Sequence, residues 1–312
     1  MFDLPESVVI EDEFLRDGLQ NEARLFSVEE KLGFVRALEA AGCKRIQVGS
    51  FVHPKWVPAM ANTDELCAHL PKTEGVTYTA LILNGAGLER ARAVGLRHLS
   101  MSVSASETHS MKNLNRTVDE ARAKMMPLIE SALGEGIAVR AGIQSALGCG
   151  FEGRIDPARV IEIARGYSDL GVQEINLADT AGLANPKQVF ELSRAVRDAI
   201  RPEVALSLHL HDTRGLGLAN MLAGLQAGVR IFDAALGGLG GCPFVPKATG
   251  NIATEDAAFA LSEMGVETGI DWRALRPAIA EAEVLLGRRL PGRMGHIRQP
   301  GEHETTDQEA CA

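Results

Sequence analysis

Eight short β-rich runs alternate with longer helical patterns along most of the chain, and this alternation constrains the fold more than any other feature. The predicted strands are residues 8–14, 45–49, 77–83, 98–104, 138–144, 174–179, 206–212 and 231–237. Helical patterns lie between them, for example at 27–42, 117–136, 156–171 and 185–200. Alternating strands and helices form parallel sheets, because each helix returns the chain to the same edge. Eight such units in 312 residues predict an α/β fold of the (β/α)8 TIM barrel type.

Capping residues mark the ends of the predicted helices. Asp156 and Asn185 stand in N-cap positions, and each is followed by a proline, which lacks the N–H group that a first helical residue leaves unpaired. Glycines follow the predicted helix ends, where a left-handed residue is favoured, at positions 42, 95, 136, 171 and 228. These signals support repeated helix–strand units.

An open, doubly wound sheet is the alternative fold. It would need a glycine-rich phosphate-binding turn after the first strand, but the turn there, LRDGLQNE (15–22), is not glycine-rich and contains neither GxGxxG nor GxxxxGK[ST]. We therefore expect residues 1–290 to form one catalytic barrel with an extra C-terminal helix at 271–290. Residues 291–312 are rich in Gly, Pro, Glu, Thr and Gln, which predicts a short, flexible or loosely docked polar tail.

Charge and cysteine usage exclude several classes of partner. A net charge of −9 argues against a nucleic-acid surface. No apolar run approaches the roughly 18 residues of a membrane span, and the acidic N-terminus resembles neither a signal nor a transit peptide. Five scattered cysteines without CxxC spacing indicate reduced thiols. These features predict a soluble cytoplasmic protein that binds neither nucleic acid nor a membrane.

Two histidines, His209 and His211, occur with one residue between them in the seventh predicted strand, so their side chains point to the same side. Asp17 follows the first strand, which neighbours the seventh and eighth in a closed barrel, and Asn251 follows the eighth. Two imidazoles, a carboxylate and an amide oxygen suit a divalent ion such as Mg²⁺ or Mn²⁺. The alternative is that the histidines are hydrogen-bonded core residues.

Arg16 and Cys242 are candidate catalytic residues. A guanidinium beside a metal can stabilise a developing enolate, although Arg16 can equally form a salt bridge at the barrel rim. Cys242 lies in the glycine-rich loop GGLGGCPF, where a thiol can donate a proton, or can be a small buried residue of a tight turn. Other polar residues at strand ends are predicted to contact the substrate, namely Gln20, Gln47, Ser106, Thr180 and Lys112.

Seven motifs, in this order, resemble the 3-hydroxy-3-methylglutaryl-CoA lyase family: LRDGLQNE, SFVHPKWVP, SALGCGFEG, ADTAG, HLHDTRG, GGLGGCPF and GNIATED. The resemblance runs from about residue 8 to 290. It implies a metal-dependent cleavage of a branched 3-hydroxyacyl-CoA to acetyl-CoA and a ketone such as acetoacetate, without an organic cofactor. It also implies a homodimer or higher homo-oligomer.

The resemblance further implies roles for individual residues. Asp17, His209, His211 and Asn251 match the metal ligands. Arg16 matches the arginine that steadies the thioester enolate, and Cys242 the cysteine implicated in proton transfer. Asp179 and Glu255 match polar residues of the active-site network, and His209 or Asp179 can relay the hydroxyl proton.

Departures from the family pattern cluster at the rim. Gln47 occupies a slot in which family lyases usually carry Glu, and EFLRD (13–17) replaces the usual VGPRD. A citramalyl-CoA-like or longer-branched thioester is therefore an alternative substrate. The residues also leave open a 2-oxo acid aldolase, a non-enzymatic barrel, and a synthase, which would generally carry a large additional C-terminal domain.

Overall fold

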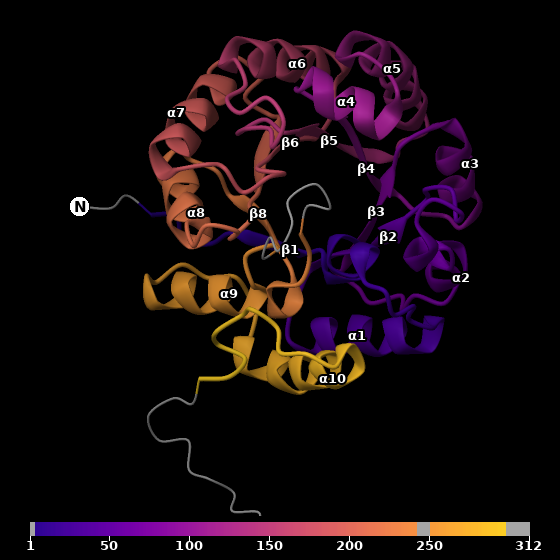
Figure 1. Cartoon of the computed structure of the whole chain (residues 1–312), viewed down its shortest axis with the longest axis vertical. Helices are drawn as coiled ribbons and strands as arrows, with labels where there is room; N and C mark the ends of the chain where they lie inside the picture. Colours follow the sequence, from indigo (N-terminus) through magenta and orange to yellow (C-terminus); the bar gives the residue numbers. More distant parts are fainter. Residues whose placement is uncertain (1–3, 242–249, 298–312) are drawn as a thin grey trace, which may run out of the picture.

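Eight parallel strands close into a barrel, with the N-terminal strand paired to the last, as the sequence predicts. The computed structural model describes residues 4–241 and 250–297. Figure 1 views the barrel with its helices arranged around it. The strands are β1 (Val9–Asp12), β2 (Arg45–Ser50), β3 (Thr77–Ile82), β4 (His98–Ser104), β5 (Ala138–Gln144), β6 (Glu174–Ala178), β7 (Ala205–His209) and β8 (Ile231–Ala234).

Helices cover the outside of the barrel. They are α1 (Val28–Ala40), α2 (Thr63–Ala68), α3 (Gly85–Ala93), α4 (Glu107–Leu114), α5 (Val118–Gly134), α6 (Pro157–Leu170), α7 (Pro186–Arg197), α8 (Gly217–Gln226), α9 (Thr254–Glu263) and α10 (Arg276–Leu286). Short turns add η1 (Phe14–Gly18), η2 (Leu19–Asn21), η3 (Pro58–Met60), η4 (Leu236–Gly238) and η5 (Trp272–Leu275). Within the described ranges, no helix is long and apolar enough to cross a membrane.

The predicted helix ends are confirmed. Asp156 and Asn185 accept hydrogen bonds from backbone N–H groups in the first turns of α6 and α7, with Pro157 and Pro186 as first residues. All five glycines expected after helices have positive φ, from 69° at Gly136 to 96° at Gly42. Local capping therefore sets where each helix stops and the next strand begins.

The first strand is shorter than predicted. β1 ends at Asp12, and residues 14–18 form the π-helical turn η1 instead of continuing the strand. The side chain of Asp12 accepts a hydrogen bond from the Phe14 N–H, 2.9 Å away, which stabilises the change of direction. Arg16 and Asp17 therefore project from a turn at the mouth of the barrel rather than from a strand.

The C-terminal segment confirms the predicted extra helix, formed by η5 and α10, which lies beside α1 and α9 (Figure 1). The described part of the predicted tail, residues 291–297, packs against the barrel. Asp256 accepts hydrogen bonds from the backbone N–H groups of Arg293 and Met294, and the Met294 side chain is buried. The first seven residues of the predicted tail are therefore docked on the barrel.

Candidate active site

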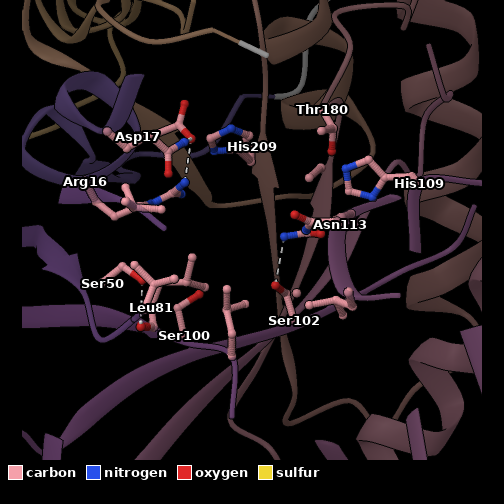
Figure 2. A pocket seen from close by; sticks show the side chains of 18 of the residues that line it. Arg16, Asp17, Ser50, Leu81, Ser100, Ser102, His109, Asn113, Thr180 and His209 are labelled. Atoms are coloured by element: carbon pink, nitrogen blue, oxygen red, sulfur yellow. Dashed lines mark hydrogen bonds and ion pairs between the residues drawn. The ribbon is translucent and has the colours of Figure 1, made fainter. Parts of the chain in front are cut away.

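A cavity of about 940 Å³ opens at the carboxyl ends of the strands. Seven of the residues predicted at the rim line it: Arg16, Asp17, Gln20, Lys112, Thr180, His209 and His211. Figure 2 shows Arg16, Asp17 and His209 on one side of this space, with Ser50, Ser100 and Ser102 lying deeper. The barrel therefore brings residues from both halves of the chain to one chamber, as TIM barrels do at this end.

Asp17, His209 and His211 form a group whose ligand atoms lie within 4.8 Å of one another, and all three residues are buried. The two Nε2 atoms face each other at 3.0 Å, and Nε2 of His211 lies 3.6 Å from Oδ2 of Asp17. His209 is the last residue of β7. His211 lies just beyond the strand, and the chain there forms an isolated bridge with Asn251.

The donor atoms fit a divalent metal ion. Asn251 Nδ2 donates to Asp17 Oδ2 at 2.9 Å and to the Leu239 carbonyl at 3.0 Å, while its Oδ1 is buried without a hydrogen-bond partner. Two converging imidazole nitrogens, a carboxylate and a spare amide oxygen match the mixed nitrogen and oxygen ligands of such ions. Arg16 and the nearby imidazoles outweigh the effect of burial and lower the pKa of Asp17, which keeps it ionised.

Asp233, on β8, contacts the Nδ1 side of the His209 ring and so orients it. Its Oδ2 lies 3.0 Å from His209 Nδ1, and Glu13 Oε2 lies 3.4 Å from the same nitrogen. Burial lowers the pKa of His209, but these two carboxylates together raise it above its ordinary value. A carboxylate on Nδ1 fixes the ring orientation and leaves Nε2 for a ligand.

Glu13, His209 and Asp233 form a second group with metal-like spacing. Cations of the protein already face both carboxylates, because Arg16 pairs with Glu13 and Arg140 with Asp233. The Asp17 group is therefore better suited to a metal ion, and the carboxylates of the second group contact the His209 ring.

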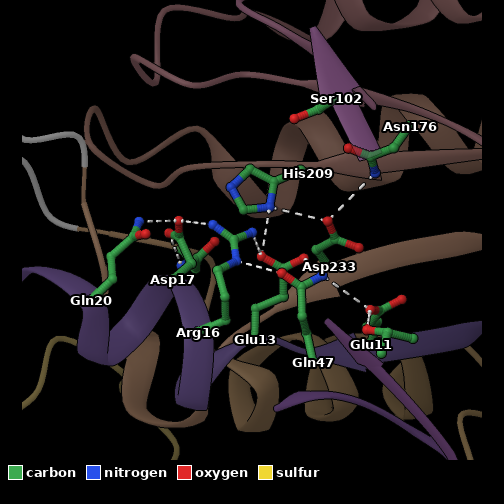
Figure 3. Close-up of polar contacts among 12 residues, drawn as sticks. Glu11, Glu13, Arg16, Asp17, Gln20, Gln47, Ser102, Asn176, His209 and Asp233 are labelled. Atoms are coloured by element: carbon green, nitrogen blue, oxygen red, sulfur yellow. Dashed lines mark hydrogen bonds and ion pairs between the residues drawn. The ribbon is translucent and has the colours of Figure 1, made fainter. Parts of the chain in front are cut away.

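Arg16 is held by three neighbours. Its guanidinium donates to Glu13, to Asp17 and to the side-chain oxygen of Gln47 (Figure 3). A guanidinium carries five N–H donors, so two remain for a ligand in the cavity. The predicted salt bridge and the predicted active-site position of Arg16 are thus both present.

Glu13 was not among the predicted site residues, yet it contacts several groups of the centre. Gln47 Nε2 donates to Glu13 Oε1 at 3.1 Å, and both side chains are buried. Burial raises the pKa of Glu13, and Arg16 opposes that effect. The signal that could have revealed Glu13 is a run of acidic residues, EDE (11–13), in a predicted strand of a buried barrel.

Arg140, from β5, was also missed. It is buried inside the barrel and faces four carboxylates: Glu11, Glu13 and Glu174 at 3.0–3.4 Å, and Asp233. Burial raises the pKa of Asp233, but Arg140 and His209 together lower it below its ordinary value. An arginine in the middle of the apolar run AVRAGIQ is the available sequence signal, since buried arginines are almost always paired.

Three substrate contacts predicted at the rim do line the cavity. Gln20 Nε2 donates to Asp17 Oδ1 at 2.9 Å. Thr180 Oγ1 accepts from the Ser145 N–H at 2.9 Å, and the Lys112 ammonium lies 4.9 Å from the centre of the Phe151 ring.

Five other predicted residues do not line this cavity, although Asn251 and Gln47 contact residues that do. Ser106 caps α4 and is fully buried, and the carboxylate of Asp179 accepts hydrogen bonds from the N–H groups of Leu183 and Ala184. Glu255 accepts from the Gly237 N–H at 3.0 Å. Ser106, Asp179, Glu255, Gln47 and Asn251 are not among the cavity-lining residues of the described chain. Cys242 lies outside the described residues.

Comparisons with known proteins identify the family of this chain. The HMGL-like family model matches residues 7–281. Hydroxymethylglutaryl-CoA lyase of Pseudomonas mevalonii is 40% identical over 280 residues, covering 90% of this chain and 93% of that protein. (R)-Citramalyl-CoA lyase of Chloroflexus aurantiacus is 42% identical over 300 residues, covering 93% and 94%.

A solved structure supports the same conclusion. An HMG-CoA lyase of Acinetobacter baumannii, in complex with coenzyme A and 3-methylmalate, matches with a TM-score of 0.90 and 36% identity over 96% of this chain and 98% of that one. Barrel and centre define a carbon–carbon lyase with a group suited to a metal ion. The chain belongs to the HMGL-like family.

Proposed function

We propose that this chain cleaves a 3-hydroxy-3-methylglutaryl-CoA-like thioester to acetyl-CoA and acetoacetate or an analogous keto acid. The observation that carries the proposal is the convergence of Asp17, His209 and His211 beside Arg16 at the mouth of the 940 Å³ cavity. The P. mevalonii and A. baumannii relatives are lyases of this type. The citramalyl-CoA lyase relative supports a citramalyl-like thioester as the alternative substrate.

Mg²⁺ or Mn²⁺ is the proposed cofactor, held by Asp17, His209 and His211 with Asn251 Oδ1 as a further ligand. A bound divalent ion would lower the pKa of the substrate's tertiary hydroxyl. No organic cofactor is required, because the cleavage moves only protons and the electron pair of one carbon–carbon bond.

His209 is the proposed acceptor of the hydroxyl proton. It lines the cavity, and the carboxylates at its Nδ1 stabilise the imidazolium that would form. Asp179 is the weaker candidate for two reasons. Its carboxylate already accepts hydrogen bonds from the backbone N–H groups of Leu183 and Ala184, and it does not line the cavity. Because His209 Nε2 cannot hold an ion and a proton at once, its ligand role and its relay role would alternate, with Asp17, His211 and Asn251 as the remaining proposed ligands.

Arg16 is the proposed stabiliser of the enolate. When the C2–C3 bond breaks, C3 becomes the ketone, and the electron pair moves onto C2 and the thioester oxygen. The two remaining N–H donors of Arg16 suit that oxygen. Protonation of C2 then gives acetyl-CoA, and Cys242 is the proposed donor on the basis of its sequence motif.

Lys112 and Arg116 both line the cavity and are the proposed contacts for the phosphates of coenzyme A. Gln20 and Thr180 are proposed to contact the acyl group. A cytoplasmic location and assembly as a homodimer or higher homo-oligomer complete the proposal, and both rest on the sequence.

Turnover of an acyl-CoA panel tests the proposed function. Purified protein with Mg²⁺ or Mn²⁺ should release acetyl-CoA from 3-hydroxy-3-methylglutaryl-CoA or citramalyl-CoA, with the keto acid identified by mass. Asp17→Ala should lose both bound metal and activity. Release of no acetyl-CoA from any member, by metal-loaded and folded protein, contradicts the proposal.

A further inference from the structure

The deep part of the cavity is built from unusually small side chains. Barrel interiors are ordinarily filled by bulky branched residues in layers. Here β4 presents Ser100 and Ser102 to the cavity, and Gly142 of β5 stands beside Ser102 in the strand register. Together with Ser50, Leu81 and Gln144, these residues form what we call the serine-lined recess.

The recess lies opposite the metal group. In Figure 2, Leu81, Ser100 and Ser102 lie below Asp17, Arg16 and His209 in the view, and all of them line the same cavity. A substrate whose tertiary hydroxyl lies at the metal group can therefore direct one of its other C3 substituents toward β3, β4 and β5. A substituent longer than methyl would fill more of this space.

Polar groups of the recess are available to a ligand. Ser102 Oγ accepts from Gln144 Nε2 at 3.1 Å, which orients the amide, and the Gln144 side-chain oxygen accepts no hydrogen bond from the described residues. Ser50 Oγ donates to the Leu81 carbonyl at 3.3 Å. The Ser100 hydroxyl forms no hydrogen bond within the described ranges and lies at the cavity surface. A ligand here would meet hydroxyl and amide groups rather than an apolar wall.

The charge of the recess disfavours an anionic substituent. Arg140 is the cation at its floor within the described chain, and four carboxylates already surround that guanidinium. A further carboxylate would meet like charges in a buried setting, where repulsion is poorly screened. The fitting group is therefore neutral.

We infer that the serine-lined recess receives the C3 substituent of the substrate, and that this substituent is longer than methyl, neutral and hydrogen-bonding. The inference rests on the proposed lyase function and narrows its substrate class. It assigns specificity to Ser100, Ser102 and Gln144, which hold neither the metal nor Arg16.

Four synthetic 3-hydroxyglutaryl-CoA thioesters test the inference, with methyl, propyl, 3-hydroxypropyl or 2-carboxyethyl at C3. The expected order of kcat/KM is hydroxypropyl above propyl above methyl, with carboxyethyl lowest and about tenfold between hydroxypropyl and methyl. Highest turnover of the methyl or carboxyethyl compound overturns the inference. Preference for propyl over hydroxypropyl overturns its hydrogen-bonding part. Cleavage of none overturns the proposed lyase function itself.

Two variants at one position separate size from polarity. Ser102→Phe fills the recess and should lower the hydroxypropyl-to-methyl ratio of kcat/KM by about tenfold or more. Ser102→Ala removes the hydroxyl without filling space, so it should keep the propyl-to-methyl ratio and lower the hydroxypropyl-to-propyl ratio. Because each ratio is taken within one protein, partial misfolding cancels. Ratios that do not move in either variant contradict the assignment. Substitution at Gly142 is less suitable, since an added Cβ would lie 2.9 Å from Ser102 Cβ.

Discussion

Gln47 Nε2 lies 3.1 Å from Glu13 Oε1, so the amide of β2 and the carboxylate that follows β1 form one buried unit beside Arg16. In the family pattern, the slot of Gln47 usually carries Glu. Here a carboxylate stands at the first position of EFLRD instead. The pair therefore presents one carboxyl group and one amide to Arg16, with the carboxyl group just after the neighbouring strand.

Glu13→Gln should lower kcat by about 10- to 100-fold, because Arg16 loses a charged partner worth about 1.5–3 kcal/mol. KM should change less, since Glu13 positions Arg16 rather than binding the ground state. Steady-state kinetics on the best panel substrate checks this. Gln47→Glu alone should also be impaired, because two carboxylates would then face each other.

The double variant Glu13→Gln, Gln47→Glu is the matched control for that pair. It keeps one carboxylate and one amide next to Arg16 and should recover most of the lost kcat. If the double variant is no better than the worse single variant, the pair does not act as a unit.

His211→Ala should lose metal and activity together, because it removes one of two converging Nε2 atoms. Metal content by mass spectrometry and kcat on the same sample measure both. Retention of stoichiometric tightly bound metal in His211→Ala would exclude this residue as a ligand.

Asp233→Asn should weaken metal affinity by about 10- to 100-fold, as loss of a carboxylate behind a ligating histidine generally does. Titration of apoprotein with Mn²⁺, followed by electron paramagnetic resonance, reports the affinity. Asp198→Asn, on the exposed end of α7, is the surface control and should bind Mn²⁺ like the parent. If the parent, Asp233→Asn and Asp198→Asn proteins bind Mn²⁺ with equal affinity, Asp233 does not support the metal site.

Glu255→Gln should change how stability depends on pH. Burial raises the pKa of Glu255 to about 8 from an ordinary 4.5, so between these values the unfolded state binds fewer protons than the folded state. The free energy of unfolding therefore falls as pH rises through this window, by at most about 1.4 kcal/mol per unit, and levels off above pH 8. Urea unfolding from pH 5 to 8 should show a flatter dependence in Glu255→Gln. The same slope in both proteins would show that Glu255 ionises normally.

The barrel and its metal group could be predicted because their signals are local or topological. Caps at Asp156 and Asn185 delimit helices, and a closed sheet places the first and seventh strands near each other whatever the side chains are. Topology therefore brings together the segments that carry His209, His211 and Asp17.

The residues behind that group could not be predicted in the same way. Whether Glu13 pairs with Gln47, or Arg140 with Asp233, depends on rotamers and strand register inside the barrel. Sequence reasoning also placed Ser106 by its position at a strand end and Asp179 by the family resemblance. Their side chains instead bond to nearby backbone and shape the loops, a local use that strand position does not reveal.

Arg140 and its four carboxylates have a consequence for engineering. Replacing buried ion networks with apolar residues often makes proteins more stable, because the charges no longer need to be desolvated. Here the same network includes Asp233, which orients His209. A variant in which apolar residues replace Arg140 and its carboxylates should therefore have a higher melting temperature and a lower kcat. Selecting variants for thermal stability alone would remove the groups on which activity depends.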